Sequence, residues 1–392
     1  MSTDSTSYIP GLQNVPATRS AISFLDGQKG ILTYRGYPIV ELAKQSSFEE
    51  TCFLLLNGEL PNASEFTEFS GELRRNRRVK YNVRDIMKFL PTNGHPMEML
   101  QTCVASLGMF YPGGERMTAE GNGPSEEFVN GTAIKILATM ATIVAMWNHI
   151  RMGDDPVPPR EDLSYAANFL YMMNEREPDA VEARIMDACL VLHAEHTINA
   201  STFAALVCGS TLAAPNLVVA SAIGTLAGPL HGGANQRVLE MLREIGAPEN
   251  AESWLEKRLA NKQVVWGFGH REYKVKDPRA DILQNMLEEL REHRGGQISP
   301  LYEIAKALES AAFERLSQKG VHPNVDFYSG VLYDALGIPE DQFTPIFAIS
   351  RTAGWLAHWK EQIGNNRIYR PTQEYVGAET RHYVALGARE AS

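Results

Sequence analysis

Apolar residues recur at helical spacing along most of the chain, and this periodicity restricts its fold more than any other feature. Five segments show it clearly, with apolar side chains every three to four positions: residues 163–171, 181–192, 234–245, 282–290 and 301–316. Alternating patterns typical of half-buried strands are few, and the best candidates are residues 20–32 and 263–266. The sequence therefore predicts an all-α, or nearly all-α, fold with long helices.

Glycine and proline divide this helical pattern into two regions. A Gly/Pro-rich stretch at residues 224–233 lies between two helical segments, and a second break follows near Pro339. These breaks predict a large domain formed by residues 1–227 and 338–392, with a smaller domain, residues 228–337, inserted into it.

Composition excludes several classes of protein. Hydrophobic residues make up 44% of the chain and charged residues 21%, which is typical of soluble globular proteins and excludes a fully disordered chain. The chain has 37 Lys plus Arg against 47 Asp plus Glu, so its net charge is −10. Such an acidic protein is a poor general binder of nucleic acid or anionic membranes.

Cysteine usage and the apolar segments indicate the compartment. The four cysteines are far apart and form no CxxC motif, which is typical of a reduced, intracellular protein. Residues 1–7 contain neither a basic start nor an apolar run, so we expect neither a signal peptide nor a transit peptide. The most apolar stretch, residues 136–147, is short for a membrane span and predicts a buried core helix. We therefore expect a cytoplasmic protein.

His231 is the first candidate catalytic residue. It lies in the motif GPLHGG, just ahead of the helix predicted at residues 234–245. The glycines allow a ligand to approach the backbone closely, and a helix N-terminus disfavours a protonated imidazole. A neutral His231 could donate an N–H hydrogen bond to an enolate oxygen. The alternative is a turn histidine whose side chain lies in water.

A second candidate cluster surrounds His270, which ends the motif GFGH. The following DPR motif predicts a helix with Asp277 as N-cap and Pro278 at the first helical position. Arg279 then lies in the first helical turn, where a cation is unfavourable unless an anion binds there. Free N–H groups and a guanidinium would form a carboxylate site. The alternative is an Arg279 that reaches back to a surface acid such as Asp281.

Asp326 lies in the motif NVDFYSG, at the start of a helix that should reach about residue 336. An Asp at a helix start is usually a cap. The functional alternative is a carboxylate base enclosed by Val325, Phe327 and Tyr328, because apolar surroundings raise the pKa of a carboxyl group.

Further candidates are two histidines and two arginines. His193 and His196 are spaced i, i+3 on a helix, but no third ligand is indicated, so we expect one to face a site and no metal centre. Arg351 and Arg370 lie in apolar surroundings. Each is either a member of a buried ion pair or an anion clamp.

Taken together, these motifs resemble the citrate synthase family. Six blocks match in order: EHTINAST (195–202), GPLHGGAN (228–235), GFGHR (267–271) with DPR (277–279), NVDFYSG (324–330), SRTAGW (350–355) and YRP (369–371). The likeness covers roughly residues 9–376. One small departure is Glu195, where the family often has an Asp before the histidine.

The resemblance implies a homodimer with a large and a small helical domain and a site between them that closes on oxaloacetate. His231 matches the histidine that hydrogen-bonds the acetyl-CoA carbonyl, and Asp326 matches the base that takes the methyl proton. His270 matches the histidine that polarises and protonates the oxaloacetate carbonyl. The residues that match those holding carboxylates are His196, Arg279 and Arg351, together with Arg370, which the family supplies across the dimer interface.

The resemblance also implies where coenzyme A binds. The backbone around the adenine matches residues 264–269, which include Val264, Gly267 and Gly269, and we assign Arg271 and Lys274 to the phosphates. It implies no metal and no tightly bound cofactor, since the coenzyme A thioester is a substrate. Assemblies beyond the dimer stay open.

Two other functions are considered. A 2-methylcitrate synthase would use propionyl-CoA, and one extra methylene is worth only about 1–3 kcal/mol of discrimination. A non-catalytic member kept for assembly or regulation would be expected to lack His231, His270 or Asp326, and the chain has all three.

Overall fold

The computed structural model describes residues 8–110 and 124–389. Residues 1–7, on which the expectation about signal peptides depends, lie outside this range. The first eight helices are α1 (Ile39–Gln45), α2 (Phe48–Asn57), α3 (Ala63–Arg75), α4 (Tyr81–Lys88), α5 (Pro96–Phe110), α6 (Glu126–Ile150), α7 (Tyr165–Asn174) and α8 (Ala180–His193). The others are α9 (Ala200–Ser210), α10 (Pro215–Leu226), α11 (Ala234–Ile245), α12 (Ala251–Ala260), α13 (Pro278–His293), α14 (Leu301–Leu316), α15 (Val325–Ala335) and α16 (Phe343–Gly364).

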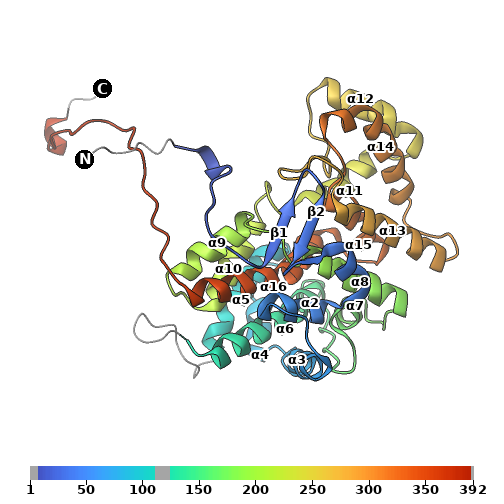
Figure 1. The fold of residues 1–392 in the computed structure, drawn as a ribbon, viewed down its shortest axis with the longest axis horizontal. Coiled ribbons are helices and arrows are strands. Elements are labelled where there is room, and N and C mark those ends of the chain that lie inside the picture. Colours follow the sequence, from blue (N-terminus) through green and yellow to red (C-terminus); the bar gives the residue numbers. More distant parts are fainter. Residues whose placement is uncertain (1–7, 111–123, 390–392) are drawn as a thin grey trace.

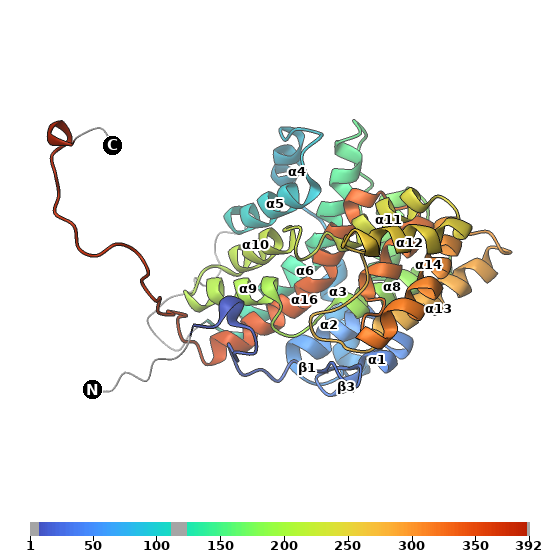
Figure 2. The same ribbon diagram turned by 90° about the horizontal axis from the view of Figure 1, so that it is seen from above.

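Helix α16 forms the centre of the core. Every residue from Phe343 to Trp359 is buried, and α16 packs against α2, α6, α8, α9 and α10 (Figures 1 and 2). Helix α6 is long and apolar enough to cross a membrane, but 67% of its most apolar 18-residue window is buried inside the protein. It is the core helix that the sequence predicts around residues 136–147.

One small antiparallel sheet lies among the described residues, and it has the order β1 (Ser23–Asp26), β2 (Ile31–Tyr34), β3 (Tyr37–Pro38). The strand predicted within residues 20–32 is therefore most of a hairpin. The strand predicted at residues 263–266 is wrong. There the backbone turns instead of pairing, because Gly267 and Gly269 adopt φ values of +78° and +82°.

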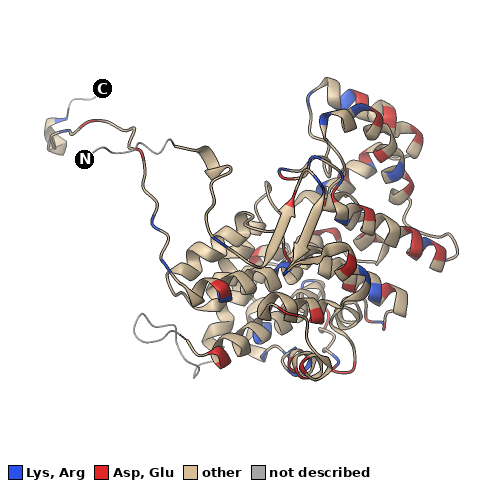
Figure 3. Ribbon diagram, viewed as in Figure 1, with Lys and Arg blue, Asp and Glu red and all other residues tan. Residues whose placement is uncertain are grey.

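Helices α11 to α15 pack mainly with one another, through α11 on α15, α12 on α14 and α13 on α15. They gather on one side of the molecule (Figure 1) and contact the rest through α13 on α8 and α1, and α11 on α16. Acidic and basic residues are interspersed along α12 to α14 (Figure 3), where Arg315 pairs with Glu252 and Glu256. The predicted small domain, residues 228–337, covers this group, and its boundaries stay a prediction.

Helix caps at α13 and α15 set the positions of two predicted site residues. Asp277 accepts a hydrogen bond from the Arg279 N–H (3.0 Å) and Pro278 follows it, as predicted. At α15 the cap is Asn324, whose side chain accepts from the Asp326 N–H (3.0 Å). The carboxylate of Asp326 is therefore not needed to cap the helix.

The C-terminal segment leaves the body of the protein after α16. Residues 370–389 are exposed, and Figures 1 and 2 show this segment extending away from the helices. It carries large apolar side chains, including Tyr375, Val376, Tyr383 and Leu386 at 71%, 89%, 86% and 76% exposure. A surface of this kind is typical of a segment that packs on another molecule.

Candidate active site

His231 lies in a tight turn that precedes α11. Its Nε2 lies 2.9 Å from Ser201 Oγ, and the Ser201 N–H donates to the same nitrogen (3.3 Å). Because Nε2 accepts this N–H, a neutral ring carries its proton on Nδ1. Burial, aided by the charge of Arg351, lowers the pKa of His231 to about 4. His231 is thus a neutral N–H donor at pH 7, and the alternative of a solvated turn histidine is wrong.

His270 is held in the complementary tautomer. The backbone N–H groups of Glu272 (3.0 Å) and Tyr273 (3.2 Å) both donate to its Nδ1. The proton of the neutral ring is therefore on Nε2. Burial, aided by the charge of Arg279, lowers the pKa of His270 to about 4. This ring is also an N–H donor with its direction fixed by the backbone.

Asp326 is partly buried, and its Oδ1 is a buried atom without a hydrogen-bond partner among the described residues. Burial raises its pKa to about 6, although the charges of Arg279 and Arg351 oppose this effect. Such a carboxylate is ionised at pH 7 and is a stronger base than an ordinary Asp. The interpretation of Asp326 as a helix cap is therefore wrong.

Arg279 is 2% exposed and forms a two-point ion pair with its own N-cap. Its Nε and one terminal nitrogen donate to the two oxygens of Asp277, at 3.0 and 2.7 Å. Burial lowers the pKa of Arg279, but Asp277 outweighs burial and the net pKa is raised. The predicted alternative, pairing with Asp281, is wrong, because Asp281 pairs with Lys276.

Arg351 is 1% exposed and lies within α16. Its Nε donates to the His193 carbonyl (2.8 Å), and its guanidinium carbon lies 4.7 Å from the centre of the Phe347 ring. Among the described residues it forms no ion pair, and burial lowers its pKa to about 10 against the opposing charge of Glu195. A buried cation of this kind favours binding of an anion.

The prediction that His193 and His196 share a helix is wrong, because α8 ends at His193 and His196 lies in the loop that follows. The two rings also differ in their surroundings. His193 Nδ1 bonds to the Cys189 carbonyl (2.8 Å), and its ring packs against Phe347. His196 is also buried, and in the described part of the chain Nε2 has no hydrogen-bond partner in either ring. The His196 ring, however, lies against His270 and Tyr273. As predicted, one histidine packs and the other is available to a site.

With the exception of Arg370, the structure brings the predicted catalytic and carboxylate-binding residues together in one cluster. The His196 and His270 ring centres are 5.2 Å apart, and each ring also contacts Tyr273. The charges of Arg279 and Arg351 shift the pKa of both His196 and Asp326, and the Arg351 charge also acts on His231. The cluster thus combines two arginines, three neutral histidines and one carboxylate.

The segment predicted to hold coenzyme A lies beside this cluster. Gly267 O accepts from the Asn324 N–H (2.9 Å), and Gly269 N–H donates to His322 O (2.8 Å). A Cβ at Gly267 would lie 2.8 Å from Val238 and 2.9 Å from Phe327, so only glycine fits there. In contrast, Val264, Arg271 and Lys274 are exposed.

Arg370 is the one predicted carboxylate-binding residue that the structure does not bring to the cluster. It is exposed on the C-terminal segment, and its guanidinium donates to the Pro371 carbonyl (3.0 Å). Its predicted role in a partner's site stays a prediction.

Sequence reasoning missed the residues that hold this cluster in place. Ser201 and Tyr273 orient or contact the histidines, and Glu195 is completely buried with hydrogen bonds from Ser23 (3.0 Å) and His358 (3.1 Å). The signal that could have indicated Glu195 is a charged residue directly before His196 in an otherwise apolar stretch.

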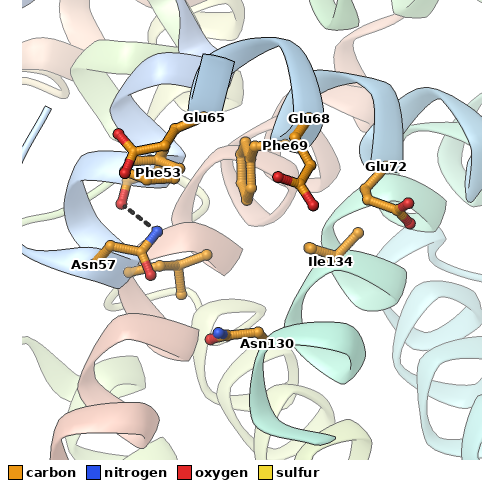
Figure 4. A pocket seen from close by; sticks show the side chains of 9 residues that line it. Phe53, Asn57, Glu65, Glu68, Phe69, Glu72, Asn130 and Ile134 are labelled. Atoms are coloured by element: carbon orange, nitrogen blue, oxygen red, sulfur yellow. Dashed lines mark hydrogen bonds between the residues drawn. The ribbon is translucent and has the colours of Figure 1, made fainter. Parts of the chain in front are cut away.

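A separate pocket lies between α2, α3 and α6 (Figure 4). It is lined by Phe53, Leu56, Asn57, Glu65, Glu68, Phe69, Glu72, Asn130 and Ile134. None of the predicted site residues is among them, so the chemistry belongs to the histidine and arginine cluster.

Comparisons with known proteins agree with this geometry. A family model described as "Citrate synthase, C-terminal domain" matches residues 11–372. The citrate synthase of Acidithiobacillus ferridurans is 56% identical over 382 residues, which cover 97% of this chain and 98% of that protein. The citrate synthase of Synechocystis is 53% identical over 392 residues, covering 100% of this chain and 96% of its own length.

Solved structures give the same result. Citrate synthase from Thermotoga maritima superposes with a TM-score of 0.86 at 38% identity, over 97% of this chain and 99% of that chain. The ternary complex of carboxymethyl coenzyme A and oxaloacetate with citrate synthase from Thermoplasma acidophilum superposes with a TM-score of 0.89 at 31% identity, over 97% of this chain and 98% of that chain. The chain is a member of the citrate synthase family.

Proposed function

We propose that the protein condenses acetyl-CoA with oxaloacetate and hydrolyses the product to citrate and coenzyme A. The observation that carries the proposal is the setting of Asp326. Asp326 is partly buried, its carboxyl group has a raised pKa and a buried oxygen without a partner, and it is coupled electrostatically to two buried arginines. A base and a binding site for a dianion are thereby combined, as this reaction requires.

The first step activates the thioester. Asp326 takes a proton from the methyl carbon of acetyl-CoA, and the electron pair moves onto the thioester oxygen to form an enolate. Its developing charge needs a positioned donor, which the Nδ1–H of neutral His231 supplies. Since the pKa of His231 is low, its imidazole is neutral, and it stabilises the enolate by a hydrogen bond without transferring its proton.

The second step forms the carbon–carbon bond. Arg351, which forms no ion pair among the described residues, and the guanidinium N–H groups of Arg279 that Asp277 does not occupy bind the two carboxylates of oxaloacetate. The unpartnered Nε2 of His196 offers a further polar contact. His270 hydrogen-bonds the ketone oxygen through Nε2–H and transfers that proton to the oxygen as the enolate carbon attacks, so the ketone becomes a hydroxyl group. A proton from solvent then restores the neutral ring. Water then cleaves the thioester of citryl-CoA to release citrate and free coenzyme A. The steps use no tightly bound cofactor.

The test of this proposal is the release of free coenzyme A with saturating oxaloacetate. We expect kcat/KM to be higher for acetyl-CoA than for propionyl-CoA. A preference for propionyl-CoA would instead favour a 2-methylcitrate synthase with the same catalytic residues. No release from either thioester would contradict the proposal and leave a non-catalytic role.

Replacing Arg279 with Ala should weaken oxaloacetate binding and also destabilise the fold. We expect the KM for oxaloacetate to rise at least ~30-fold, because truncating a buried, hydrogen-bonded charge typically costs about 2–5 kcal/mol. Asp277 would be left as an unpaired buried charge, so the free energy of unfolding should fall by about 3–5 kcal/mol. Kinetics with each substrate varied check the first effect, and a change confined to acetyl-CoA would show that the placement of Arg279 is wrong.

The proposed assembly is a homodimer in which the exposed C-terminal segment carries Arg370 to the partner's site. Its support is the exposed apolar surface of that segment and the position of Arg370 outside the cluster. Whether one site uses residues from both subunits can be tested by coexpressing an Arg370→Ala chain with an Asp326→Asn chain. In a mixed dimer one site would have both residues intact.

Random pairing makes half of the dimers mixed, each with one working site of two, so we expect about a quarter of wild-type activity from two inactive parents. Activity equal to the sum of the separately expressed variants would contradict a shared site.

A further inference from the structure

The hairpin formed by β1, its turn and β2 (residues 23–34) contacts the residues next to His196 and those next to His270, the two histidines assigned to oxaloacetate. Its base, at Ser23 and Tyr34, lies against residues 194–197, and its tip, at Gly27, lies against residues 272–274. The first contact belongs to the predicted large domain and the second to the predicted small domain. One short element of about 13 Å, at about 3.3 Å per strand residue, thus joins the two sides of the site.

The base of the hairpin holds both neighbours of His196. Ser23 Oγ donates to the Glu195 carboxylate (3.0 Å) and accepts from the Thr197 N–H (3.3 Å). Tyr34, which pairs with Ser23 across the strands, donates its hydroxyl to the Glu195 carbonyl (2.8 Å). His196 is therefore fixed from both sides by one cross-strand pair.

The carboxylate that Ser23 contacts is itself fixed by α16. His358 Nε2 donates to Glu195 Oε1 (3.1 Å). A Cβ at Gly354 would collide with the other oxygen, so the helix leaves just enough room for the carboxylate. Burial raises the pKa of Glu195, but the charges of His358 and Arg351 outweigh burial and the net pKa is lowered. The acceptor of the Ser23 hydrogen bond is thus an ionised group.

Thr197 needs such a restraint because its backbone is in an unfavourable conformation. Its φ of +53° lies in the left-handed region, which a β-branched residue rarely adopts. The surrounding structure must offset this strain. The hydrogen bond from its N–H to Ser23 is a contact that does so directly beside His196.

The tip of the hairpin acts on His270 in the same way. Gly27 packs so closely on the Glu272 carbonyl that a Cβ would collide with it, and the Gly27 carbonyl accepts from the Lys274 N–H (2.9 Å). The N–H groups of Glu272 and Tyr273 are the two that orient His270 Nδ1. The tip thus supports the peptide groups that set the tautomer and direction of His270.

We infer that this hairpin is a positioning element of the oxaloacetate site, with Ser23 fixing His196 and Gly27 fixing the loop that orients His270. The inference rests on the proposed function, because it assigns these histidines to oxaloacetate. Neither Ser23 nor Gly27 is proposed to touch a substrate. Both act through the residues that do.

The first test replaces Ser23 with Ala. We expect kcat/KM for oxaloacetate to fall about tenfold, because a misplacement well under 1 Å of a substrate-holding group already costs rate. The KM for acetyl-CoA should stay within about twofold, since the Ser23 end of the hairpin does not contact the coenzyme A segment. Ser23→Thr keeps the hydroxyl on a strand and should restore the oxaloacetate parameters. Ser20→Ala removes a nearby hydroxyl whose one side-chain hydrogen bond among the described residues is from the Ile22 N–H, and it should have no effect.

The second test replaces Gly27 with Ala, which pushes the tip away from the Glu272 peptide. We expect a fall in kcat as well as a rise in the KM for oxaloacetate, since His270 contributes to the chemical step. Gln28→Ala, an exposed change in the same turn, is the matched control and should behave as wild type.

Wild-type turnover of both substrates is measured first, and its absence would refute the proposed function rather than the role of the hairpin. With an active wild type, unchanged oxaloacetate parameters in both Ser23→Ala and Gly27→Ala would overturn the inference. A lower melting temperature and a smaller fraction of active enzyme, with both KM values unchanged, would also overturn the inference. That result would show that the hairpin has a purely structural role.

Discussion

Asp326→Asn is expected to lower kcat by about 10³-fold, within the range that a positioned general base contributes. The amide has nearly the shape of the carboxylate but cannot take the methyl proton. Oxaloacetate binding should persist, because Arg279 and Arg351 remain and a buried negative charge near them is removed. Steady-state kinetics and calorimetric titration with oxaloacetate measure the two effects separately.

Asp334→Asn is the matched control, since Asp334 is on the same helix and bonds to Ser299 (2.6 Å) away from the cluster. It should retain wild-type kcat. Near-normal turnover of Asp326→Asn would contradict its assignment as the base, and loss of oxaloacetate binding in that variant would show that Asp326 has a binding role instead.

His231→Ala is expected to lower kcat by about 10²–10³-fold, the usual effect of removing one donor from an oxyanion site. The donor is lost while Asp326 keeps its raised pKa, because burial and the charge of Asp277 raise that pKa against the charges of Arg279 and Arg351, and His231 is not among the causes. The KM for oxaloacetate should change little. Single-turnover measurements with both substrates bound distinguish a slow chemical step from weak binding.

His95→Ala is a suitable control for that substitution. His95 is exposed at the start of α5, where its ring accepts from the Met97 N–H (3.2 Å), so it serves local structure only. If His231→Ala lost no more activity than His95→Ala, the enolate would have to be stabilised by another group.

Helix positions were predictable because their signal is local. The apolar stripe at 234–245 coincides with α11, and the Asp277–Pro278 start of α13 was read from cap and proline preferences alone. The strand at 263–266 was mispredicted because the glycines that follow adopt positive φ values and direct the backbone toward residues 322–324.

The site was predictable to the extent that it depends on motifs. The motifs indicated His231, His270 and Asp326, but the alternatives for Asp326 and Arg279 could be decided only by contacts. The Glu195 carboxylate shows why: its partners Ser23 and His358 are 172 and 163 residues away in the chain. Pairings over such separations leave no periodic or spacing signal in a single sequence.

The most direct test of the central claim is the pH dependence of kcat/KM for acetyl-CoA at saturating oxaloacetate, between pH 5 and 8. Burial raises the pKa of Asp326 to about 6, so below that pH the base becomes protonated and loses its function. The pKa values of His231 and His270 are lowered to about 4, so neither histidine titrates in this range. We predict a plateau above pH 7 and a fall that approaches tenfold per pH unit below about 6. A profile that stays flat down to pH 5, or rises on acidification, would contradict Asp326 as the base.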